Sequence, residues 1–331
     1  MKRVTIHDVA KEAGVSVTTV SRVLNDRGYI STEMKEKVLK AIKELNYIPN
    51  EMARSFFSNQ SKFIALIVPT TENPFFGELT FRIEKALAKF GYHLFICNSL
   101  NDPENEEKYL RLLNEKRVDG IIVGSHNVDI SEYKNYENQI VSIERKLTEN
   151  IPMIQSDDYN GGVLATRELI SQGCSNILCV IGDKNVETPA NDRSLGYISE
   201  MEKNNLKPRF IEIPFQIGYE EKYKIIKDTF QTKFNFDGVF AGDDVNAKLF
   251  MNVAKEMNYD IPEDIKIVGF DGTQTMRSLV PELSTVVQPI EQLANEAVKI
   301  LLDLLQGKKV KKESTLPVEL YLSRTTNRIK N

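Results

Sequence analysis

The sequence is poor in the residue types that define several common classes of protein. Its 331 residues include three cysteines, three histidines and no tryptophan. Cys97, Cys174 and Cys179 form no CxxC pair and no metal-ligand spacing with histidine, so reduced and mostly buried thiols are predicted, and neither a metal nor another cofactor is expected. No apolar run approaches the roughly 20 residues of a membrane-spanning helix, and no apolar stretch follows the basic start of the chain. A cytoplasmic protein with no membrane partner is therefore expected.

Catalytic motifs are also missing. The chain has no GxSxG, P-loop or HExxH motif, and the first predicted strand is not followed by the glycine-rich turn of a nucleotide-binding enzyme. An enzyme is therefore not expected. What the sequence does have is enough apolar residues, 41%, to build a large core in two or three domains.

Charge is distributed unevenly along the chain. Residues 1–62 carry 11 Lys and Arg against 7 Asp and Glu, a net charge of +4, whereas the rest of the chain carries a net charge of −8. A basic head on an acidic body suggests that the head alone meets an anionic polymer.

Two short helices are predicted in the head. The apolar positions of residues 6–13 recur at the spacing of one helix face, and Gly14 ends that helix. Ser16 can cap a second helix at 17–24 after a turn of about three residues. Two helices joined so closely are typical of a helix-turn-helix, whose second helix enters the DNA major groove.

The outward side chains of the second predicted helix suit a DNA groove. They are short hydroxyls with one arginine and one asparagine: Thr18, Thr19, Ser21, Arg22 and Asn25. Arginine can pair with guanine through two hydrogen bonds, hydroxyls can bind phosphates or bases, and a threonine methyl can pack on thymine. The alternative is an ordinary surface hairpin, which would more often carry Glu and Lys on this face.

A third helix is predicted from Ser31 to about Leu45. Asn50 can cap a last short segment at 51–57, which is too short to form a stable helix alone, and a polar linker follows it to Lys62. The predicted domains are a DNA-binding headpiece at 1–49, a hinge helix and linker at 50–62, and a body at 63–331.

Three segments of the head, residues 4–16, 19–25 and 45–50, resemble the headpiece of the lac/gal repressor family. That resemblance implies a hinge helix that folds on operator DNA and inserts a side chain, usually leucine, into the minor groove. Phe56 falls at this position, and an aromatic wedge can also unstack base steps. The residues expected to contact DNA are Thr5, Ser16, Val17, Thr18, Thr19, Ser21, Arg22, Asn25, Tyr29, Asn50, Ala53, Arg54 and Phe56.

The body alternates short apolar runs with amphipathic stretches. The first runs, at 63–68, 92–97 and 120–123, are separated by predicted helices, and a similar series restarts near residue 161. Continuous apolar runs separated by helices favour parallel strands that are buried on both faces. We therefore predict an all-α head and an α/β body of two doubly wound subdomains, which the family resemblance likens to periplasmic binding proteins.

A ligand site is predicted in the cleft between these subdomains, because open α/β sheets bind ligands in loops at the carboxyl ends of their strands. The loops expected there carry carboxylates, an arginine and aromatic rings. Carboxylates accept hydrogen bonds from sugar hydroxyls, arginine donates to sugar oxygens, and phenylalanine covers the apolar face of a sugar ring. The predicted effector-binding residues are Phe75, Phe76, Glu144, Asp158, Arg193, Phe215, Asp243 and Asp271.

The family resemblance continues through the body and implies effector contacts at most of the same positions. It is carried by the segments 118–122, 192–197, 268–271, 283–289 and 323–324. Glu144 stands where the family has aspartate, and Asp243 where it has asparagine or glycine, which leaves the identity of the ligand open.

Within the family, the strings at 124–127, 156–162 and 270–273 most resemble sucrose-operon repressors of Gram-positive bacteria, with ribose-operon repressors as the nearest alternative. The expected function is repression of a sugar operon under the control of a small sugar or sugar phosphate. The alternatives are a catabolite regulator with a phosphocarrier protein as co-effector and a sugar-binding receptor without a DNA role.

The oligomeric state follows from the size of the DNA-reading element. One helix-turn-helix reads only about four base pairs, so a homodimer on a pseudo-palindromic, double-stranded operator is expected. The chain shows no heptad-repeat tail, which argues against a tetramer.

Overall fold

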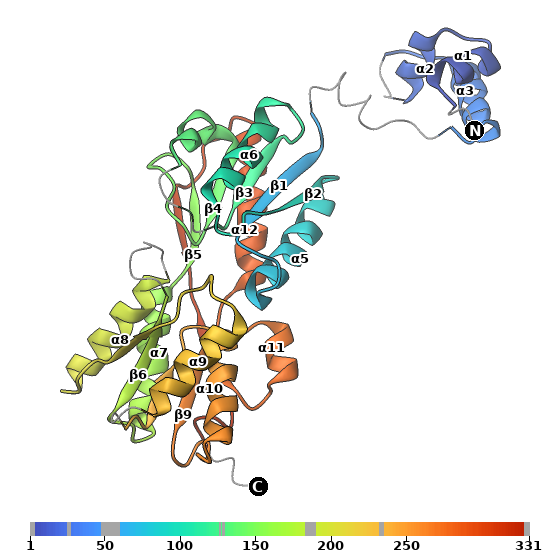
Figure 1. The fold of residues 1–331 in the computed structure, drawn as a ribbon. Helices are drawn as coiled ribbons and strands as arrows, with labels where there is room; N and C mark the ends of the chain where they lie inside the picture. Colours follow the sequence, from blue (N-terminus) through green and yellow to red (C-terminus); the bar gives the residue numbers. More distant parts are fainter. Residues whose placement is uncertain are drawn as a thin grey trace. The chain divides into compact units, whose positions relative to one another are not determined.

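The computed structural model describes residues 4–24, 28–47, 60–125, 127, 130–182, 190–231 and 235–327. The chain divides into two units, the head Met1–Lys62 and the body Phe63–Asn331 (Figure 1). A search of the described ranges finds no helix that is long and apolar enough to cross a membrane.

The described part of the head contains the helices α1 (Ile6–Ala13), α2 (Val17–Leu24) and α3 (Thr32–Glu44). Before α1, the Thr5 backbone N–H and hydroxyl donate to the Asp8 carboxylate at 2.8 and 2.7 Å. Gly14 ends α1 at φ +64°, a left-handed conformation that costs glycine little. Ser16 Oγ accepts from the Thr19 N–H at 3.1 Å, which confirms the predicted cap of α2.

One small apolar core joins the three helices of the head. Each helix contributes two buried residues to it: Val9, Ala10, Val20, Val23, Val38 and Ala41. The apolar spacing read from the sequence therefore identifies the inner face of α1, whereas on α3 the apolar side chain of Leu39 is half exposed and does not join this core.

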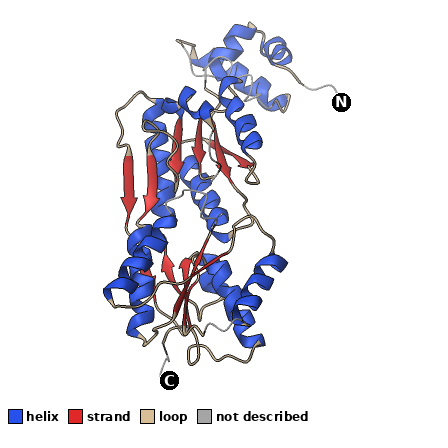
Figure 2. Ribbon diagram, turned by 60° about the vertical axis from the view of Figure 1, so that its left-hand side comes forward, coloured by secondary structure: helices blue, strands red, loops and turns tan. Residues whose placement is uncertain are grey.

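The body is built from two six-stranded sheets with the same strand order. We call the first sheet with its helices subdomain 1, in the order β11-β5-β4-β3-β1-β2, and the second subdomain 2, in the order β12-β10-β9-β8-β6-β7. Figure 2 shows both sheets with helices packed around them. The predicted doubly wound architecture is confirmed, except that β12 runs antiparallel to β10 at the edge of subdomain 2.

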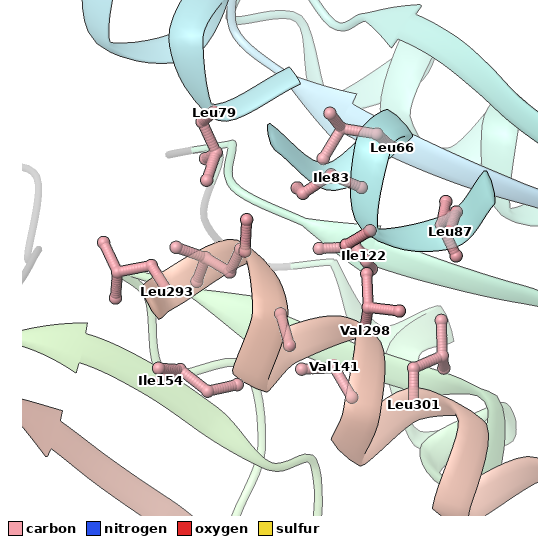
Figure 3. Close-up of a cluster of buried hydrophobic side chains, with 14 of the residues drawn as sticks. Leu66, Leu79, Ile83, Leu87, Ile122, Val141, Ile154, Leu293, Val298 and Leu301 are labelled. Atoms are coloured by element: carbon pink, nitrogen blue, oxygen red, sulfur yellow. The ribbon is translucent and has the colours of Figure 1, made fainter. Parts of the chain in front are cut away.

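In subdomain 1 the strands are β1 (Phe63–Val68), β2 (His93–Asn98), β3 (Gly120–Val123), β4 (Ile140–Ile143), β5 (Met153–Ser156) and β11 (Glu313–Leu316). The helical elements are α5 (Pro74–Ala88), α6 (Pro103–Asn114), the 3-10 helices η1 (Ser131–Asn135) and η2 (Glu137–Gln139), and α12 (Ile290–Leu305). α5 and α12 bury aliphatic side chains against one face of the sheet, as Figure 3 shows for Leu79 and Ile83 facing Leu293 and Val298. α6 and η1 cover the other face.

In subdomain 2 the strands are β6 (Ile177–Ile181), β7 (Phe210–Glu212), β8 (Gly238–Phe240), β9 (Lys266–Asp271), β10 (Ser284–Val287) and β12 (Glu319–Tyr321). The helices are α7 (Asp158–Ser171), α8 (Asn191–Lys203), α9 (Tyr219–Phe230), α10 (Asp244–Glu256) and α11 (Gln274–Leu279). α7 and α8 share one apolar core with the sheet, and α9 and α10 share the other.

The two subdomains are not consecutive along the chain. The chain crosses between them three times, from β5 to α7, from β10 to α12 and from β11 to β12. Consequently α12 and β11, from the C-terminal part of the chain, complete subdomain 1. Apolar periodicity identifies an element but does not say which sheet it joins.

The strand β2 differs from its prediction as a strand buried on both faces. It is an edge strand paired only with β1, and the side chains of Phe95 and Ile96 are each half exposed. Cys97 is nevertheless buried, as are Cys174 and Cys179, and none of the three forms a disulfide, as predicted.

Candidate functional site

A cleft of about 550 Å³ lies between the two subdomains. Its lining includes seven of the eight predicted effector-binding residues: Phe75, Phe76, Glu144, Arg193, Phe215, Asp243 and Asp271. The eighth, Asp158, is buried behind Arg193 and contacts it directly. The structure therefore brings the whole predicted set together.

Several of these residues lie in helices or strands and not in the loops that were predicted. Phe75 and Phe76 are in the first turn of α5, because the Asn73 side chain caps that helix by accepting from the Phe75 N–H at 2.9 Å and Pro74 follows it. Asp158 and Arg193 lie in the first turns of α7 and α8, and Asp271 ends β9. The ends of the helices, and not only the loops, thus face the cleft.

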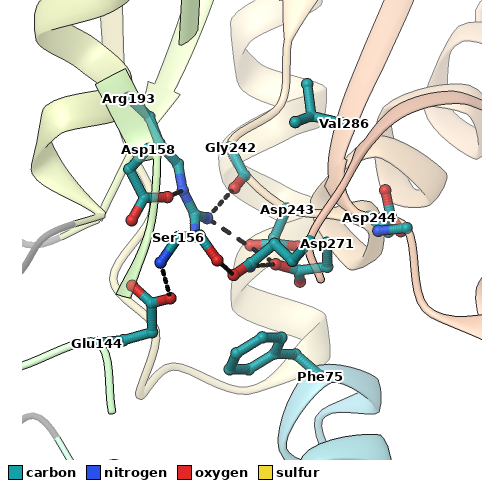
Figure 4. A network of polar contacts seen from close by, with 12 residues as sticks. Phe75, Glu144, Ser156, Asp158, Arg193, Gly242, Asp243, Asp244, Asp271 and Val286 are labelled. Carbon is teal, nitrogen blue, oxygen red and sulfur yellow. Dashed lines mark hydrogen bonds and ion pairs between the residues drawn. The ribbon is translucent and has the colours of Figure 1, made fainter. Parts of the chain in front are cut away.

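Arg193 is the centre of a buried polar network (Figure 4). Its Nε donates to Asp158 Oδ1 at 2.6 Å, and one terminal nitrogen donates to the Gly242 carbonyl at 2.8 Å. The same nitrogen lies 4.0 Å from Asp271 Oδ1. The guanidinium carbon lies 3.7 Å from the centroid of the Phe270 ring. Arg193 is thereby fixed on several sides, as a ligand-orienting arginine requires.

Two glycines allow Arg193 to reach Asp158, because they let α7 and α8 approach closely. A Cβ at Gly162 would lie 2.0 Å from the Arg193 carbonyl oxygen, and one at Gly196 would lie 2.1 Å from the Tyr159 carbonyl oxygen. Any side chain at either position would push the helices apart. The glycine at both sites is therefore part of how the site is built.

Two acidic residues of the cleft have strained backbones. Glu144 has φ +55° at the end of β4, and Asp271 has φ +104° at the end of β9. Such values are rare for residues other than glycine and often mark functional positions. Burial raises the pKa of Asp271 well above its ordinary value, and burial together with the nearby Asp158 does the same for Glu144.

Two further carboxylates lie at the start of α10. Asp243 caps the helix by accepting from the Asn246 N–H at 2.7 Å, and burial raises its pKa. Asp244 accepts from the Thr285 hydroxyl at 2.5 Å and from the Gly272 N–H at 2.9 Å. Burial raises the pKa of Asp244 to about 7. Asp243 lines the cleft, whereas Asp244 supports the backbone beneath it.

The aromatic residues form a continuous apolar surface in the cleft. The rings of Phe75 and Phe76 meet edge to face with centroids 5.2 Å apart, and Phe76 meets Phe215 in the same way at 6.0 Å. Phe215 belongs to the loop after β7, yet it packs against the core of subdomain 1. The three rings can therefore cover one face of a ligand from both sides of the cleft.

The sequence analysis missed a set of polar cleft residues. Most are amides, and they are Asn73, Asn101, Asn127, Asn191, Ser194, Gln216, Asn246 and Gln288. Glu144 Oε2 and Asn246 Oδ1 are buried and accept no hydrogen bond from the described residues. These atoms can accept hydrogen bonds from ligand hydroxyls. Asn127 and Gln288 lie within segments that carried the family resemblance, which is the one signal that could have singled them out.

The side chains of the cleft suit the binding of a polar ligand. The described residues contain no group of three or more His, Cys, Asp and Glu suited to a metal ion. Burial raises the pKa of Cys179, which lines the cleft, so its thiol stays protonated and unreactive. Carboxylates, amides, one arginine and aromatic rings together suit a polyhydroxylated molecule.

The head presents part of its predicted DNA-contacting set to solvent. Thr18 and Arg22 are exposed on α2, and Tyr29 is 97% exposed. Ser16 is also exposed, whereas Val17, Thr19 and Ser21 are half-buried, so the outward face is narrower than predicted. Thr5 is exposed at the start of α1. The remaining predicted contacts, Asn25, Asn50, Ala53, Arg54 and Phe56, lie outside the described residues.

Both parts of the chain match known families. Residues 5–50 match the family described as bacterial regulatory proteins, lacI family, and residues 166–326 match the periplasmic binding protein-like domain. The chain is 43% identical over 317 residues to the sucrose operon repressor of Pediococcus pentosaceus, covering 95% of this chain and 97% of that protein. It is 40% identical over 323 residues to the ribose operon repressor of Halalkalibacterium halodurans, covering 97% of each.

Among solved structures, the chain is similar to the lac repressor dimer bound to operator and the anti-inducer ONPF. The TM-score is 0.85 and the identity 25%, over 98% of this chain and 99% of that one. A helix-turn-helix head in one chain with a two-subdomain body of periplasmic-binding type defines a class of bacterial transcription regulators. The chain belongs to the lacI family of bacterial regulatory proteins. Its named relatives are transcriptional repressors and not enzymes, in agreement with the missing catalytic motifs.

Proposed function

We propose that this protein is a transcriptional repressor of a sugar-utilisation operon, with sucrose as the preferred sugar, and that it acts in the cytoplasm as a homodimer. One observation carries this proposal: a single chain holds both an exposed helix-turn-helix face and a cleft of hydroxyl-binding side chains. Sucrose and ribose operon repressors among its relatives support the sugar class. The 43% identity to a sucrose operon repressor favours sucrose.

The proposed DNA partner is a double-stranded, pseudo-palindromic operator read by α2 from each protomer. Thr18 and Arg22 lie four residues apart on α2, so their exposed side chains share one helix face. We assign base contacts to these two residues and contacts to phosphates to Ser16 and Tyr29. The segment 50–62 is proposed to be the hinge, with Phe56 as the minor-groove wedge.

The proposed effector is an uncharged sugar and not a sugar phosphate. Among the described residues that line the cleft, the charged ones are Glu144, Asp243, Asp271 and Arg193. Arg193 is the single cation of this set, and it already contacts Asp158 and the Gly242 carbonyl. A phosphate group would therefore meet more carboxylates than available cations, whereas carboxylates and amides readily accept from neutral hydroxyls.

Operator binding in the presence of sugars tests this function. Fluorescence anisotropy with labelled operator is followed while sucrose, fructose, ribose, sucrose 6-phosphate, a phosphocarrier protein or buffer is added. We expect sucrose or a fructose-containing sugar to change operator affinity, and the phosphorylated form to have little effect. A response to ribose alone would support the ribose alternative, and a response only to a phosphocarrier protein would support the catabolite regulator. If the chain binds sugar and no operator, the receptor without a DNA role is the better assignment.

Asp271→Ala tests the location of the sugar site. The expected result is loss of the sugar's effect on operator binding, with operator affinity in the absence of sugar close to wild type, since the substitution lies in the body. Unchanged sugar affinity in this variant, measured by calorimetry, would show that the site lies elsewhere.

Arg22→Ala tests the DNA-reading face. If Arg22 reads a base, the loss of its paired hydrogen bonds should cost about 1–3 kcal/mol of operator binding and relax the sequence preference. A uniform loss on all DNA sequences, together with a smaller salt dependence, would instead identify Arg22 as a phosphate contact.

A further inference from the structure

Three short segments carry the chain between the subdomains, and one buried side chain links them to the cleft. This side chain is Gln288, which lies in the crossing from β10 to α12 and is 3% exposed. The other two crossings are tied together, because the Asp157 N–H donates to the Leu316 carbonyl at 2.8 Å. Gln288 therefore sits where the relative orientation of the subdomains is determined.

Gln288 forms hydrogen bonds to both subdomains. Its Nε2 donates to Asp271 Oδ1 at 2.7 Å, and its Oε1 accepts from the Ser156 hydroxyl at 2.7 Å. The Ser156 N–H in turn donates to Glu144 Oε1 at 2.7 Å. The amide of Gln288 thus connects a cleft carboxylate of subdomain 2, through Ser156, to a cleft carboxylate of subdomain 1.

The chemistry of its partners fixes the orientation of this amide. A carboxylate oxygen accepts hydrogen bonds, so the NH₂ group of Gln288 faces Asp271 and its carbonyl is left for the Ser156 hydroxyl, which can donate. Ser156 is 1% exposed and Asp271 is 7% exposed. Breaking either hydrogen bond leaves buried polar atoms without their protein partner.

Gln288 also holds the strained backbone of Asp271. The Gln288 N–H donates to the Asp271 carbonyl at 3.0 Å, in addition to the side-chain hydrogen bond. A residue with φ +104° persists only because its surroundings hold it. Since one residue supplies both hydrogen bonds, a displacement of Asp271 is passed on to Gln288.

We propose that Gln288 is a positioning residue that couples occupation of the cleft to the angle between the subdomains. This inference rests on the proposed function, because the occupant is the effector sugar. A sugar hydroxyl that donates to Asp271 Oδ1 competes with Gln288 Nε2 for the same acceptor, so the Gln288–Ser156 hydrogen bond differs between the sugar-free and sugar-bound states. A ligand shifts a conformational equilibrium only through such differences.

Ser156→Ala in the whole chain is the direct test. It removes the hydrogen bond between Ser156 and Gln288 and leaves every side chain of the cleft lining in place. Sugar affinity is measured by calorimetry, and operator affinity by anisotropy with and without a saturating amount of the sugar that acts on wild type. Sugar affinity is expected to stay within about threefold of wild type. The sugar-dependent change in operator affinity, about 5- to 150-fold for ordinary allosteric coupling, is expected to fall to about threefold or less.

Ser142→Ala is the matched control. Ser142 is a fully buried serine of the neighbouring strand β4, and its hydroxyl donates to the Pro152 carbonyl at 3.2 Å. The control therefore also loses a buried serine hydrogen bond but does not touch Gln288. Ser142→Ala is expected to keep the wild-type sugar response. If the role of Ser156 is purely structural, the sugar response will stay intact in both variants, and this result would overturn the proposal.

Gln288→Leu gives a second measurement on the same contact. We expect it to lose the sugar response and also part of the sugar affinity, because Asp271 loses its donor. Adding Ser156→Ala to Gln288→Leu should cause no further loss of response, since both substitutions remove one hydrogen bond. A full sugar response in Ser156→Ala contradicts only the role of Gln288 and leaves the proposed function standing. If no sugar changes the operator affinity of the wild type, the proposed function is wrong, and this inference is wrong with it.

Discussion

Among the charged and aromatic residues that line the cleft, subdomain 1 contributes chiefly the rings of Phe75 and Phe76, whereas subdomain 2 contributes chiefly Arg193, Asp243 and Asp271. The two have the same strand order, so the difference does not come from topology. It comes from the residues placed at the carboxyl ends of equivalent strands and at the first turns of the helices that follow. Among these charged and aromatic residues each subdomain supplies one exception, Glu144 in subdomain 1 and Phe215 in subdomain 2, and amides line the cleft from both.

This distribution of charged and aromatic residues is complementary to the two kinds of surface on a sugar ring. One face of a pyranose or furanose is relatively apolar, and the edges of the ring carry hydroxyls. The rings of Phe75 and Phe76, which we call the aromatic wall, can cover the apolar face. The charged wall, Arg193, Asp243 and Asp271, can bind the hydroxyls, so the two together can hold the sugar in one orientation. Neither wall alone can both cover the apolar face of the sugar and bind its hydroxyls. The sugar therefore interacts fully only when both subdomains contact it, which is a physical reason for its affinity to depend on the angle between them.

The largest effect on stability and sugar binding is expected when the positive charge of Arg193 is removed from the charged wall of subdomain 2. Arg193→Met leaves Asp158 and Asp271 buried without their cation, so we expect the free energy of unfolding of the body to fall by about 3–5 kcal/mol. Sugar binding should be lost. Thermal unfolding and calorimetry measure the two effects.

Arg167→Met is the matched control for that experiment. Arg167 on α7 also pairs with a carboxylate on α8, Glu200, at 3.2 Å, but its side chain is 54% exposed. The Glu200 carboxylate is itself only 7% exposed, but Lys203 also lies 3.9 Å from it, so removing the half-exposed Arg167 should cost clearly less than removing Arg193, and sugar binding should persist. Equal destabilisation by the two substitutions would contradict the special role assigned to the buried pair.

The head was more accessible to sequence analysis than the body. Its helices are fixed by local signals, such as the cap at Ser16 and the glycine stop at Gly14, which act over a few residues. The sheets of the body depend on contacts between residues far apart in sequence. The return of α12 and β11 to subdomain 1 is invisible to periodicity, because an amphipathic helix packs equally well on either sheet.

Most residues of the candidate site could also be predicted from the sequence, because the signal that identifies them is again local. The rule that ligands bind at the carboxyl ends of strands locates Asp243 and Asp271 without knowledge of the full topology. The same rule misplaced Phe75 and Arg193 in loops, because it does not tell where the next helix begins. Gln288 was missed because its importance arises from a crossing between subdomains, which no local pattern reveals.

The second expected effect is a pH dependence of stability that arises in subdomain 2. Burial raises the pKa of Asp244 to about 7, above its value in the unfolded chain, so the folded state binds more protons between about pH 4 and 7. The contribution of Asp244 to stability therefore falls as pH rises through this window. Asp244→Asn should flatten this part of the pH profile by on the order of 2–4 kcal/mol, measured by thermal unfolding without sugar.

Asn suits this test because it resembles protonated Asp244. Its carbonyl can accept from the Gly272 N–H while its NH₂ group donates to the Thr285 hydroxyl oxygen. Asp228→Asn, at an exposed position on α9 in the same subdomain, is the control and should leave the profile unchanged. A wild-type slope retained in Asp244→Asn would mean that other buried carboxyls carry the pH dependence.

The smallest expected effect concerns the aromatic wall of subdomain 1. Phe75→Leu keeps an apolar side chain of similar reach but removes the flat ring, so sugar affinity should fall roughly threefold to tenfold, from the loss of about 0.5–1.5 kcal/mol of ring contact. Phe215→Leu removes a ring from the opposite side, together with its edge-to-face contact to Phe76. If the walls are as different as the structure indicates, calorimetry will find that both substitutions weaken sugar binding far less than Arg193→Met. If instead Phe75→Leu abolishes binding while the body stays folded, the ring and not the charged network is the main source of affinity, and the two walls must be ranked in the reverse order.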